Sequence, residues 1–232
     1  MHLPESIALP LFRRVYPHIR RRAGSPVPPI RRLVKPVDGT AAYAFNRLFN
    51  ASLLTQSQRP IEYDLPYPKL DFLNYLCDWR GLVAHGTSLD ALAMLEPVRL
   101  STDDNEFGNR RQIFATPDAI WALWFAILGK SRLRLTRNGC LGIGGEGRRE
   151  KYYHFELERD LEGRHPFTSG TIYLARAEDF PSRPRIPMLA LLGCDLEEWG
   201  SPDPVKPLAR LPVEPSDFPY LDQVQYCLER RG

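Results

Sequence analysis

The sequence predicts an α+β fold built around a largely antiparallel sheet. Apolar side chains recur at intervals of three and four residues over 41–54 and 69–80, as in helices with one buried face. Later, KYYHFELE (151–158) alternates apolar and polar residues, and TIYL (171–174) is rich in residues that favour strands. Because helices precede strands instead of alternating with them, an antiparallel sheet is favoured over a parallel one.

The composition narrows the class of protein. The chain has 232 residues, 43% of them hydrophobic, which is enough for a substantial core. It contains no run of about 18 apolar residues, and Pro10 interrupts the short apolar start of the chain. We therefore expect a cytoplasmic protein without membrane contact. Its four cysteines form no CxxC pair, so reduced thiols are expected instead of a zinc site or disulfide framework.

The first part of the chain, residues 1–68, is expected to be a proline-rich, partly basic extension of a compact domain over 69–232. Its prolines predict an extended arm, with one short helical turn at most, over residues 1–37. Residues 11–35 hold eight basic and no acidic residues, which leaves 23 basic against 28 acidic residues elsewhere. Such an arm could bind nucleic-acid phosphates or lie along the acidic body. The basic residues are Arg13, Arg14, Arg20, Arg21, Arg22, Arg31, Arg32 and Lys35.

Two short strands, each followed by a helix, are predicted in the middle of the chain. Residues 81–84 read as the first strand, and Ser88 is placed to cap a helix that Pro97 ends. A polar loop leads to a second strand over 112–116. A strongly apolar helix then begins at Pro117, capped by the threonine before it.

The second half of the chain is expected to be mostly strands. Asn138-Gly139 is the strongest short hairpin signal and predicts a tight turn. Residues 204–213 predict one or two further strands. Residues 142–147 spell GxGxxG, but residues 148–158 alternate as a strand where a dinucleotide-binding loop requires a helix, so we expect a flexible hairpin loop.

His85 is the most informative candidate for a functional residue. The chain has no GxSxG motif, and its five histidines lack the spacing of metal ligands, so neither a serine-hydrolase site nor a metal site is expected. His85 instead ends an apolar strand and precedes Gly86 and Thr87. The glycine permits a ligand to approach the backbone closely, and the threonine adds a hydroxyl. The alternative is a hydrogen-bonded structural histidine.

A series of short motifs resembles the N-terminal half of ADP-ribosyltransferase-fold domains. The motifs are His85-Gly86-Thr87, Leu95-Glu96-Pro97, Ile113-Phe114-Ala115-Thr116 and the helical residues 122–126. In that superfamily an H-G-T/S strand is followed by a (V/I)-(Y/F)-A-(T/S) strand and a helix packed against it. The resemblance covers residues 70–215 by order of elements. It implies a split antiparallel β-sheet sandwich with flanking helices that binds NAD, as a substrate, between two small sheets.

The resemblance also implies roles for individual residues. His85 would bond a ribose hydroxyl of NAD, and the backbone of Gly86, beside Thr87, would hold the nicotinamide amide. Phe114 stands where many relatives have a stacking tyrosine, and it faces either the cleft or the core. In the second case Thr116 and Ala115 line the cleft.

A glutamate on a late strand completes the site in that family, because it stabilises the positive charge that develops on the ribose as nicotinamide leaves. Glu198 is the first candidate and Glu197 the second, while a solvated acidic turn is the alternative interpretation. The remaining candidates are Glu156, Glu158 and Glu178. Arg110 and Arg111 could bind the pyrophosphate, or they could offset the acidic residues before them.

These expectations together describe an NAD-dependent ADP-ribosyltransferase that acts on a macromolecular acceptor, either a protein or a nucleic acid. One alternative is a non-catalytic protein of the same fold that binds a nucleotide or a partner. The other is a nucleic-acid binder that acts through residues 11–35. The position of the late glutamate relative to His85 discriminates the catalytic hypothesis from the first alternative.

Overall fold

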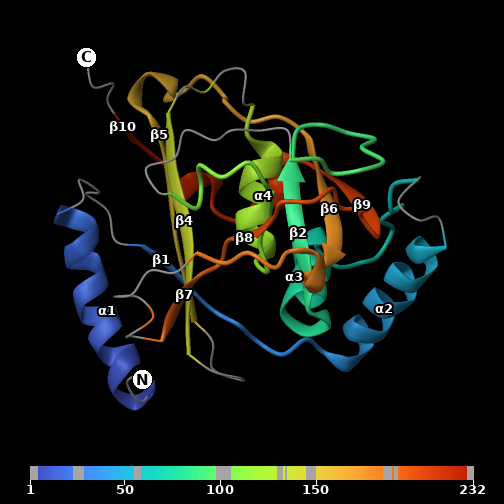
Figure 1. The fold of residues 1–232 in the computed structure, drawn as a ribbon, viewed down its shortest axis with the longest axis horizontal. Coiled ribbons are helices and arrows are strands. Elements are labelled where there is room, and N and C mark those ends of the chain that lie inside the picture. The colour runs from blue at the N-terminus through green and yellow to red at the C-terminus, as the bar shows by residue number, and fades with distance from the viewer. Residues whose placement is uncertain are drawn as a thin grey trace.

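The computed structural model describes residues 5–22, 29–54, 59–97, 106–129, 133, 135–144, 150–184, 190 and 193–228. Over these residues the protein has an α+β fold with largely antiparallel sheets, as the sequence predicts (Figure 1). The helices are α1 (Glu5–Arg22), α2 (Gly39–Leu53), α3 (Lys69–Arg80) and α4 (Ala119–Ile127). Helices α2 and α3 confirm the two helices expected from apolar spacing. Short 3-10 turns cover Arg159–Leu161, Ala177–Asp179, Pro215–Asp217 and Leu221–Gln223.

The larger sheet is formed by strands from both ends and the middle of the chain. Its antiparallel order is β1 (Ile30–Leu33), β5 (Glu150–Glu158), β4 (Thr136–Ile143) and β7 (Cys194–Leu196). Strand β10 (Gln225–Leu228) runs parallel to the end of β5. Strands near both termini therefore share one edge of β5.

The remaining strands form two smaller antiparallel sheets. The first has the order β2 (Leu82–Thr87), β6 (Gly170–Arg176) and β9 (Ala209–Val213). The second pairs β3 (Ile113–Ala115) with β8 (Trp199–Ser201). An isolated bridge between Ala84 and Thr116 joins the two. Strands β6 and β9 confirm the late strands that the sequence predicts.

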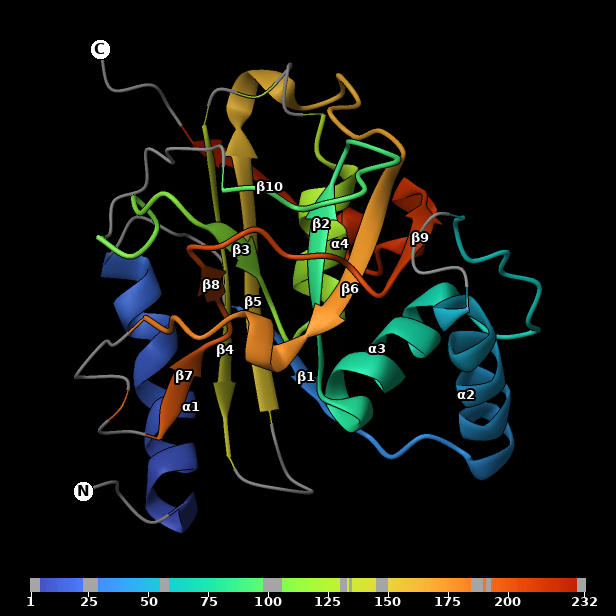
Figure 2. The same cartoon turned by 45° about the vertical axis from the view of Figure 1, so that its right-hand side comes forward.

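Helix α4 lies between the larger sheet and the β2-β6-β9 sheet (Figures 1 and 2). On one side Trp124 packs against Phe155 of β5, with 4.8 Å between ring centroids. On the other side the backbone of α4 approaches β2 and β6 closely at Gly86 and Gly170. Because both sides of the helix are buried, its sequence AIWALWFAI has no polar face.

The expected extended arm over residues 1–37 is wrong in two places. Residues 5–22 form α1 despite two internal prolines, and Ile30–Leu33 pairs with β5 as a strand. The buried side chains of Ala8, Phe12 and Tyr16 recur every four residues, and Phe12 and Tyr16 pack on the outer face of the larger sheet. This burial compensates for the helical hydrogen bonds that Pro10 and Pro17 cannot form.

The helix expected after Ser88 is also absent, since residues 88–97 are described and contain no helix. Ala91 has a left-handed φ of 58°, and the Tyr173 hydroxyl accepts a hydrogen bond from the backbone of Leu92 at 3.0 Å. Leu95 pairs with Val205 through an isolated bridge. The apolar residues of this segment are therefore drawn onto the outer face of β2 and β6, which overrides their helical spacing.

Two local predictions about turns and caps are wrong as well. Asn138-Gly139 lies inside β4, not in a hairpin turn. Asn138 accepts a hydrogen bond from the Trp121 indole at 2.7 Å, and a Cβ on Gly139 would lie 2.5 Å from the ring of His154. A side chain at position 139 would therefore have to displace the ring of His154. Helix α4 is capped by Asp118, whose carboxylate accepts from the backbone of Trp121 at 2.7 Å, and not by the preceding threonine.

Several other expectations can be compared with the structure. Strand β5 follows the GxGxxG segment, so the helix that a dinucleotide-binding loop requires is not there; residues 145–149 of the expected hairpin loop lie outside the described part. The cysteines are free thiols, and three of the four are buried. Among the described helices, none combines the length and apolar character needed to cross a membrane.

Candidate functional site

The side chain of His85 is fixed by the neighbouring strand β3. Its Nδ1 lies 2.7 Å from the carbonyl oxygen of Phe114, and because a carbonyl can only accept, the ring donates from Nδ1. The ring also lies beside Tyr173, its cross-strand neighbour on β6, with centroids 6.5 Å apart. His85 is thus half-buried and held in one orientation where β2 meets β3 and β6.

Strands β2 and β3 pair over a short stretch only. Within the described residues, they exchange backbone hydrogen bonds at Ala84 and Thr116, with N···O distances of 2.8 and 3.0 Å. In an extended strand the backbone groups of every second residue point to the same edge, so those of Gly86 point to the edge that faces β3. The predicted residues His85, Gly86, Phe114 and Thr116 are therefore brought together where these two strands meet.

Gly86 is required by packing against α4. A Cβ at this position would lie 1.9 Å from the carbonyl oxygen of Ala122. The face of Gly86 that a side chain would occupy is therefore closed by the helix. Gly86 is itself buried, so a ligand would have to reach its backbone groups from the strand edge. Thr87, the next residue, is buried, and its hydroxyl accepts a hydrogen bond from the backbone of Leu89 at 3.2 Å.

Glu197 and Glu198 lie where the chain passes from one sheet to another. Strand β7 of the larger sheet ends at Leu196, and β8 begins at Trp199 beside β3. Glu197 is only 2% exposed, and its backbone N–H donates to the carbonyl of Cys140 in β4 at 3.0 Å. Glu197 therefore continues the larger sheet, whereas Glu198 leads into β8.

The pairing of β8 with β3, and of Thr116 with Ala84, gives the position of Glu198 relative to β2, the strand that carries His85. Trp199 pairs with Ala115, and the next residue of that strand segment, Thr116, pairs with Ala84. Glu198 therefore lies about two strand spacings, on the order of 10 Å, from β2. Of the two adjacent glutamates, Glu197 is buried and Glu198 is half-buried, and Glu198 is the one that the register brings next to Thr116.

The other candidate glutamates lie elsewhere. Glu156 and Glu158 belong to β5 of the larger sheet, where Glu156 pairs with Arg137 at 3.4 Å. The Glu158 carboxylate accepts from the backbone of Leu135 at 2.7 Å. Glu178 is exposed and lines a hollow of about 330 Å³. The residues lining that hollow are Arg176, Glu178, Asp179, Pro181, Ser201, Asp203, Pro204, Val205 and Lys206, which include none of the predicted site residues in β2 or β3.

Arg110 and Arg111 are held by local partners. Arg110 forms an ion pair with Glu106 at 3.1 Å, and Arg111 donates from Nε to the carbonyl of Pro97 at 2.8 Å. Both side chains are exposed. Phe107, from the same segment, packs edge-on against Phe114 with 5.9 Å between ring centroids. The ring of Phe114 is therefore partly covered by Phe107.

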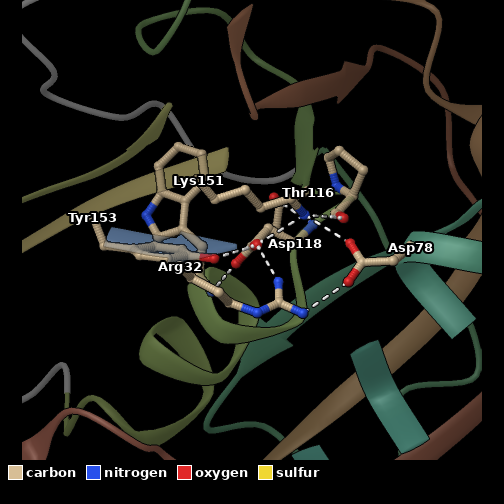
Figure 3. Close-up of polar contacts among 8 residues, drawn as sticks. Arg32, Asp78, Thr116, Asp118, Lys151 and Tyr153 are labelled. Atoms are coloured by element: carbon tan, nitrogen blue, oxygen red, sulfur yellow. Dashed lines mark hydrogen bonds and ion pairs between the residues drawn. The ribbon is translucent and has the colours of Figure 1, made fainter. Parts of the chain in front are cut away.

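A group of buried charges, which sequence reasoning missed, lies beside this site (Figure 3). We call it the buried charge cluster; it consists of Arg32, Asp78, Asp118, Lys151 and Tyr153. The Lys151 ammonium lies 2.9 Å from a carboxylate oxygen of Asp78 and 2.9 Å from one of Asp118. Arg32 binds Asp78 at 2.8 Å, and the Tyr153 hydroxyl donates to Asp118 at 2.8 Å.

The charges in this cluster stabilise one another. Burial opposes ionisation of Asp118, but Lys151 and Arg32 outweigh that effect and lower the pKa of this carboxyl. Burial likewise opposes the charge on Lys151, yet Asp118 and Asp78 raise its pKa above the ordinary value. A signal was present in the sequence: in the alternating strand KYYHFELE, the lysine falls on the same face as Tyr153 and Phe155.

Within the described part of the chain, three of the eight basic residues over 11–35 are bound to the body of the protein. Arg13 and Arg31 both bind the carboxylate of Glu150, and Arg32 belongs to the buried charge cluster. Arg14, Arg21 and Lys35 are exposed. Deleting residues 1–37 would remove α1, β1 and Arg32 together. Only substitutions at the exposed residues can therefore test nucleic-acid binding cleanly.

Comparison with protein-family models, curated proteins and solved structures finds no match to this chain. Its chemistry must therefore be argued from its own residues. Among the described residues, no group of histidine, cysteine and acidic side chains is arranged to hold a metal ion.

Proposed function

We propose that the protein is an NAD-dependent ADP-ribosyltransferase whose site lies where β2, β3 and β8 come together. The observation that carries this proposal is the strand edge at Gly86, next to a histidine whose ring is locked by Phe114. The backbone of Gly86 points to that edge, where an N–H and a carbonyl can pair with a planar carboxamide such as that of nicotinamide. The resemblance to ADP-ribosyltransferase-fold domains assigns the same task to this glycine.

His85 suits a positioning task in nucleotide binding. Because Nδ1 is the donor to Phe114, a neutral ring has Nε2 as its acceptor, and a ribose hydroxyl is a matching donor. Glycine at 86 allows the backbone of α4 to approach β2 closely, so the strand that carries His85 packs directly against the helix. On this side, NAD would therefore contact a strand that is held in place by the helix.

Glu198 is the residue we propose for stabilising the transition state. When the bond between nicotinamide and ribose breaks, positive charge develops on the ribose, and a preplaced carboxylate stabilises that charge. Glu198 immediately precedes β8, two strand spacings from β2 with Thr116 between them, so the ribose would lie over the face of these strands and not between them. The acceptor is a macromolecule, a protein or a nucleic acid.

The test is release of nicotinamide from NAD by the wild type and by Glu198→Gln and Glu197→Gln. We expect release by the wild type and a loss on the order of 10²-fold or more in Glu198→Gln. Since Glu197 continues the larger sheet, its glutamine variant serves as the adjacent control and should retain most of the activity. NAD binding without any release in the wild type would instead favour a non-catalytic protein of the same shape.

A further inference from the structure

Lys151 uses all three ammonium protons on groups from different parts of the chain. Its Nζ contacts Asp78 and Asp118, each at 2.9 Å, and donates to the carbonyl of Pro117 at 3.3 Å. Asp78 belongs to α3, whereas Pro117 and Asp118 connect β3 to α4. One side chain of the larger sheet therefore binds both elements that flank the histidine strand (Figure 3).

Each of these partners leads directly to the candidate site. The backbone N–H of Asp118 donates to the hydroxyl of Thr116 at 3.0 Å, and Thr116 pairs with Ala84 of β2. The carboxylate of Asp118 caps α4, whose Ala122 carbonyl presses on Gly86. Lys151 is therefore connected to Ala84 of β2 through Asp118 and Thr116, and to Gly86 through Asp118 and the first turn of α4.

The helix that carries Asp78 supplies a third connection. Helix α3 ends at Gly81, a residue with a left-handed φ of 64°, and β2 begins at the next residue. A shift of Asp78 would therefore move the start of β2.

We infer that Lys151 is a positioning residue of the candidate site, which holds the edges of β2 and β3 at the spacing that the dinucleotide requires. This inference rests on the proposed function for its effect on NAD. It does not make Lys151 a catalytic residue, because the ammonium is 2% exposed and acts through Asp118, Pro117 and Asp78.

The chain offers a matched control on the same strand. Glu150, the residue before Lys151, is also 2% exposed and also holds two cationic partners, but it faces the opposite side of β5. Its partners Arg13 and Arg31 belong to α1 and β1; β1 also carries Arg32 of the buried charge cluster, but Arg32 is the neighbour of Arg31 and so faces the other side of that strand. Loss of Glu150 should therefore disturb α1 and the outer face of β1 more than the site.

The experiment compares Lys151→Met, Lys151→Arg and Glu150→Gln with the wild type in two measurements. The first is hydrogen exchange of backbone amides, made without any ligand, over residues 84–87 and 116–122. The second is the dissociation constant for NAD. Methionine keeps the length of the lysine stem without charge, whereas the planar guanidinium of arginine cannot reproduce three divergent contacts at one nitrogen.

We expect both Lys151 variants to exchange faster than the wild type over those two segments, while amides in the centre of β4 and β5 keep their protection. We also expect weaker NAD binding, on the order of 10²-fold in Lys151→Met, because small misplacements of binding groups have large effects. Glu150→Gln should accelerate exchange in α1 and β1 and leave NAD affinity unchanged. If Lys151→Met does not fold, Lys151→Arg carries the comparison.

The inference is overturned if exchange over 84–87 and 116–122 stays at the wild-type rate in the Lys151 variants, or if Glu150→Gln changes those segments equally. The two proposals fail separately. A wild type that does not bind NAD refutes the proposed function, while the exchange measurement still decides whether Lys151 sets the strand edges. A wild type that binds NAD with an affinity unaffected by either Lys151 variant refutes the positioning role alone.

Discussion

Gly86 belongs both to the packed core and to the candidate site, and each requires that it has no side chain. A Cβ there would lie 1.9 Å from the Ala122 carbonyl oxygen, which belongs to helical backbone and cannot move aside cheaply. We expect Gly86→Ala to lower the free energy of unfolding by about 3 kcal/mol, measured by urea denaturation.

Gly39 supplies the control for that substitution. No atom lies within 4 Å of a Cβ built at Gly39, which begins α2. Gly39→Ala should leave stability unchanged or raise it by up to about 1 kcal/mol, because alanine loses less conformational entropy in a helix. Equal stability of the two variants would show that α4 does not press on β2 as described.

The ionisation of Glu150 makes the stability of the protein depend on pH in the acid range. Burial opposes its ionisation, but hydrogen bonds from Arg31, Arg13 and Tyr152 prevail and lower its pKa to about 2. Since the folded pKa lies below the unfolded value, the stabilisation is complete above about pH 5 and is lost as the pH falls toward 2. It amounts to about 3 kcal/mol at neutral pH.

We therefore expect Glu150→Gln to be less stable than the wild type at pH 7 and to approach it at pH 2 to 3. Thermal or urea unfolding across this pH range provides the measurement. A constant difference between the two proteins from pH 7 to pH 2 would contradict the account, because the neutral amide lacks the proton-linked stabilisation of the carboxylate.

The candidate site could be located in the sequence by local signals, but the residues that support it could not. His85 and Gly86 follow an apolar strand directly, and the structure places them beside Phe114 and Thr116. Lys151, in contrast, reaches Asp78 and Asp118 from sequence positions 73 and 33 residues away. No spacing rule connects such residues. Only the alternation of β5 indicated that the lysine faces inward.

At the scale of elements, α1 depends on tertiary packing more than on its own sequence. Phe12 is 1% exposed and stacks on Tyr16 with 4.7 Å between ring centroids. We expect Phe12→Ala to weaken the attachment of α1 by about 3–5 kcal/mol and to accelerate tryptic cleavage within the helix. The adjacent Leu11 is 41% exposed, so Leu11→Ala should be cleaved at the wild-type rate.

Equal cleavage of both variants would mean that α1 is not docked through its Phe12 face. The same element explains why the sequence prediction failed at the N-terminus. Two prolines made a helix unfavourable by local rules, but the apolar side chains repeated every four residues match the outer face of the larger sheet. Helix α3 was predictable over its full length because its apolar spacing, its start after Pro68 and its end at Gly81 agree.

At the scale of the whole molecule, α4 and the buried charge cluster connect two layers that would otherwise be separate. The larger sheet contributes Lys151, while the smaller sheets contribute the strand edges of the candidate site. The class of fold could be predicted from the order of helices and strands. The way the chain divides its strands among three sheets could not, because it depends on pairings such as that of β1 with β5, distant in sequence.

The most direct test of the central claim is calorimetric titration of NAD into the wild type and into His85→Ala. The account predicts saturable binding by the wild type and a loss of affinity on the order of tenfold or more in the variant, with the fold retained by circular dichroism. Absence of binding in the wild type at millimolar NAD would contradict the account and leave His85 as a structural residue that fixes β2 to β3.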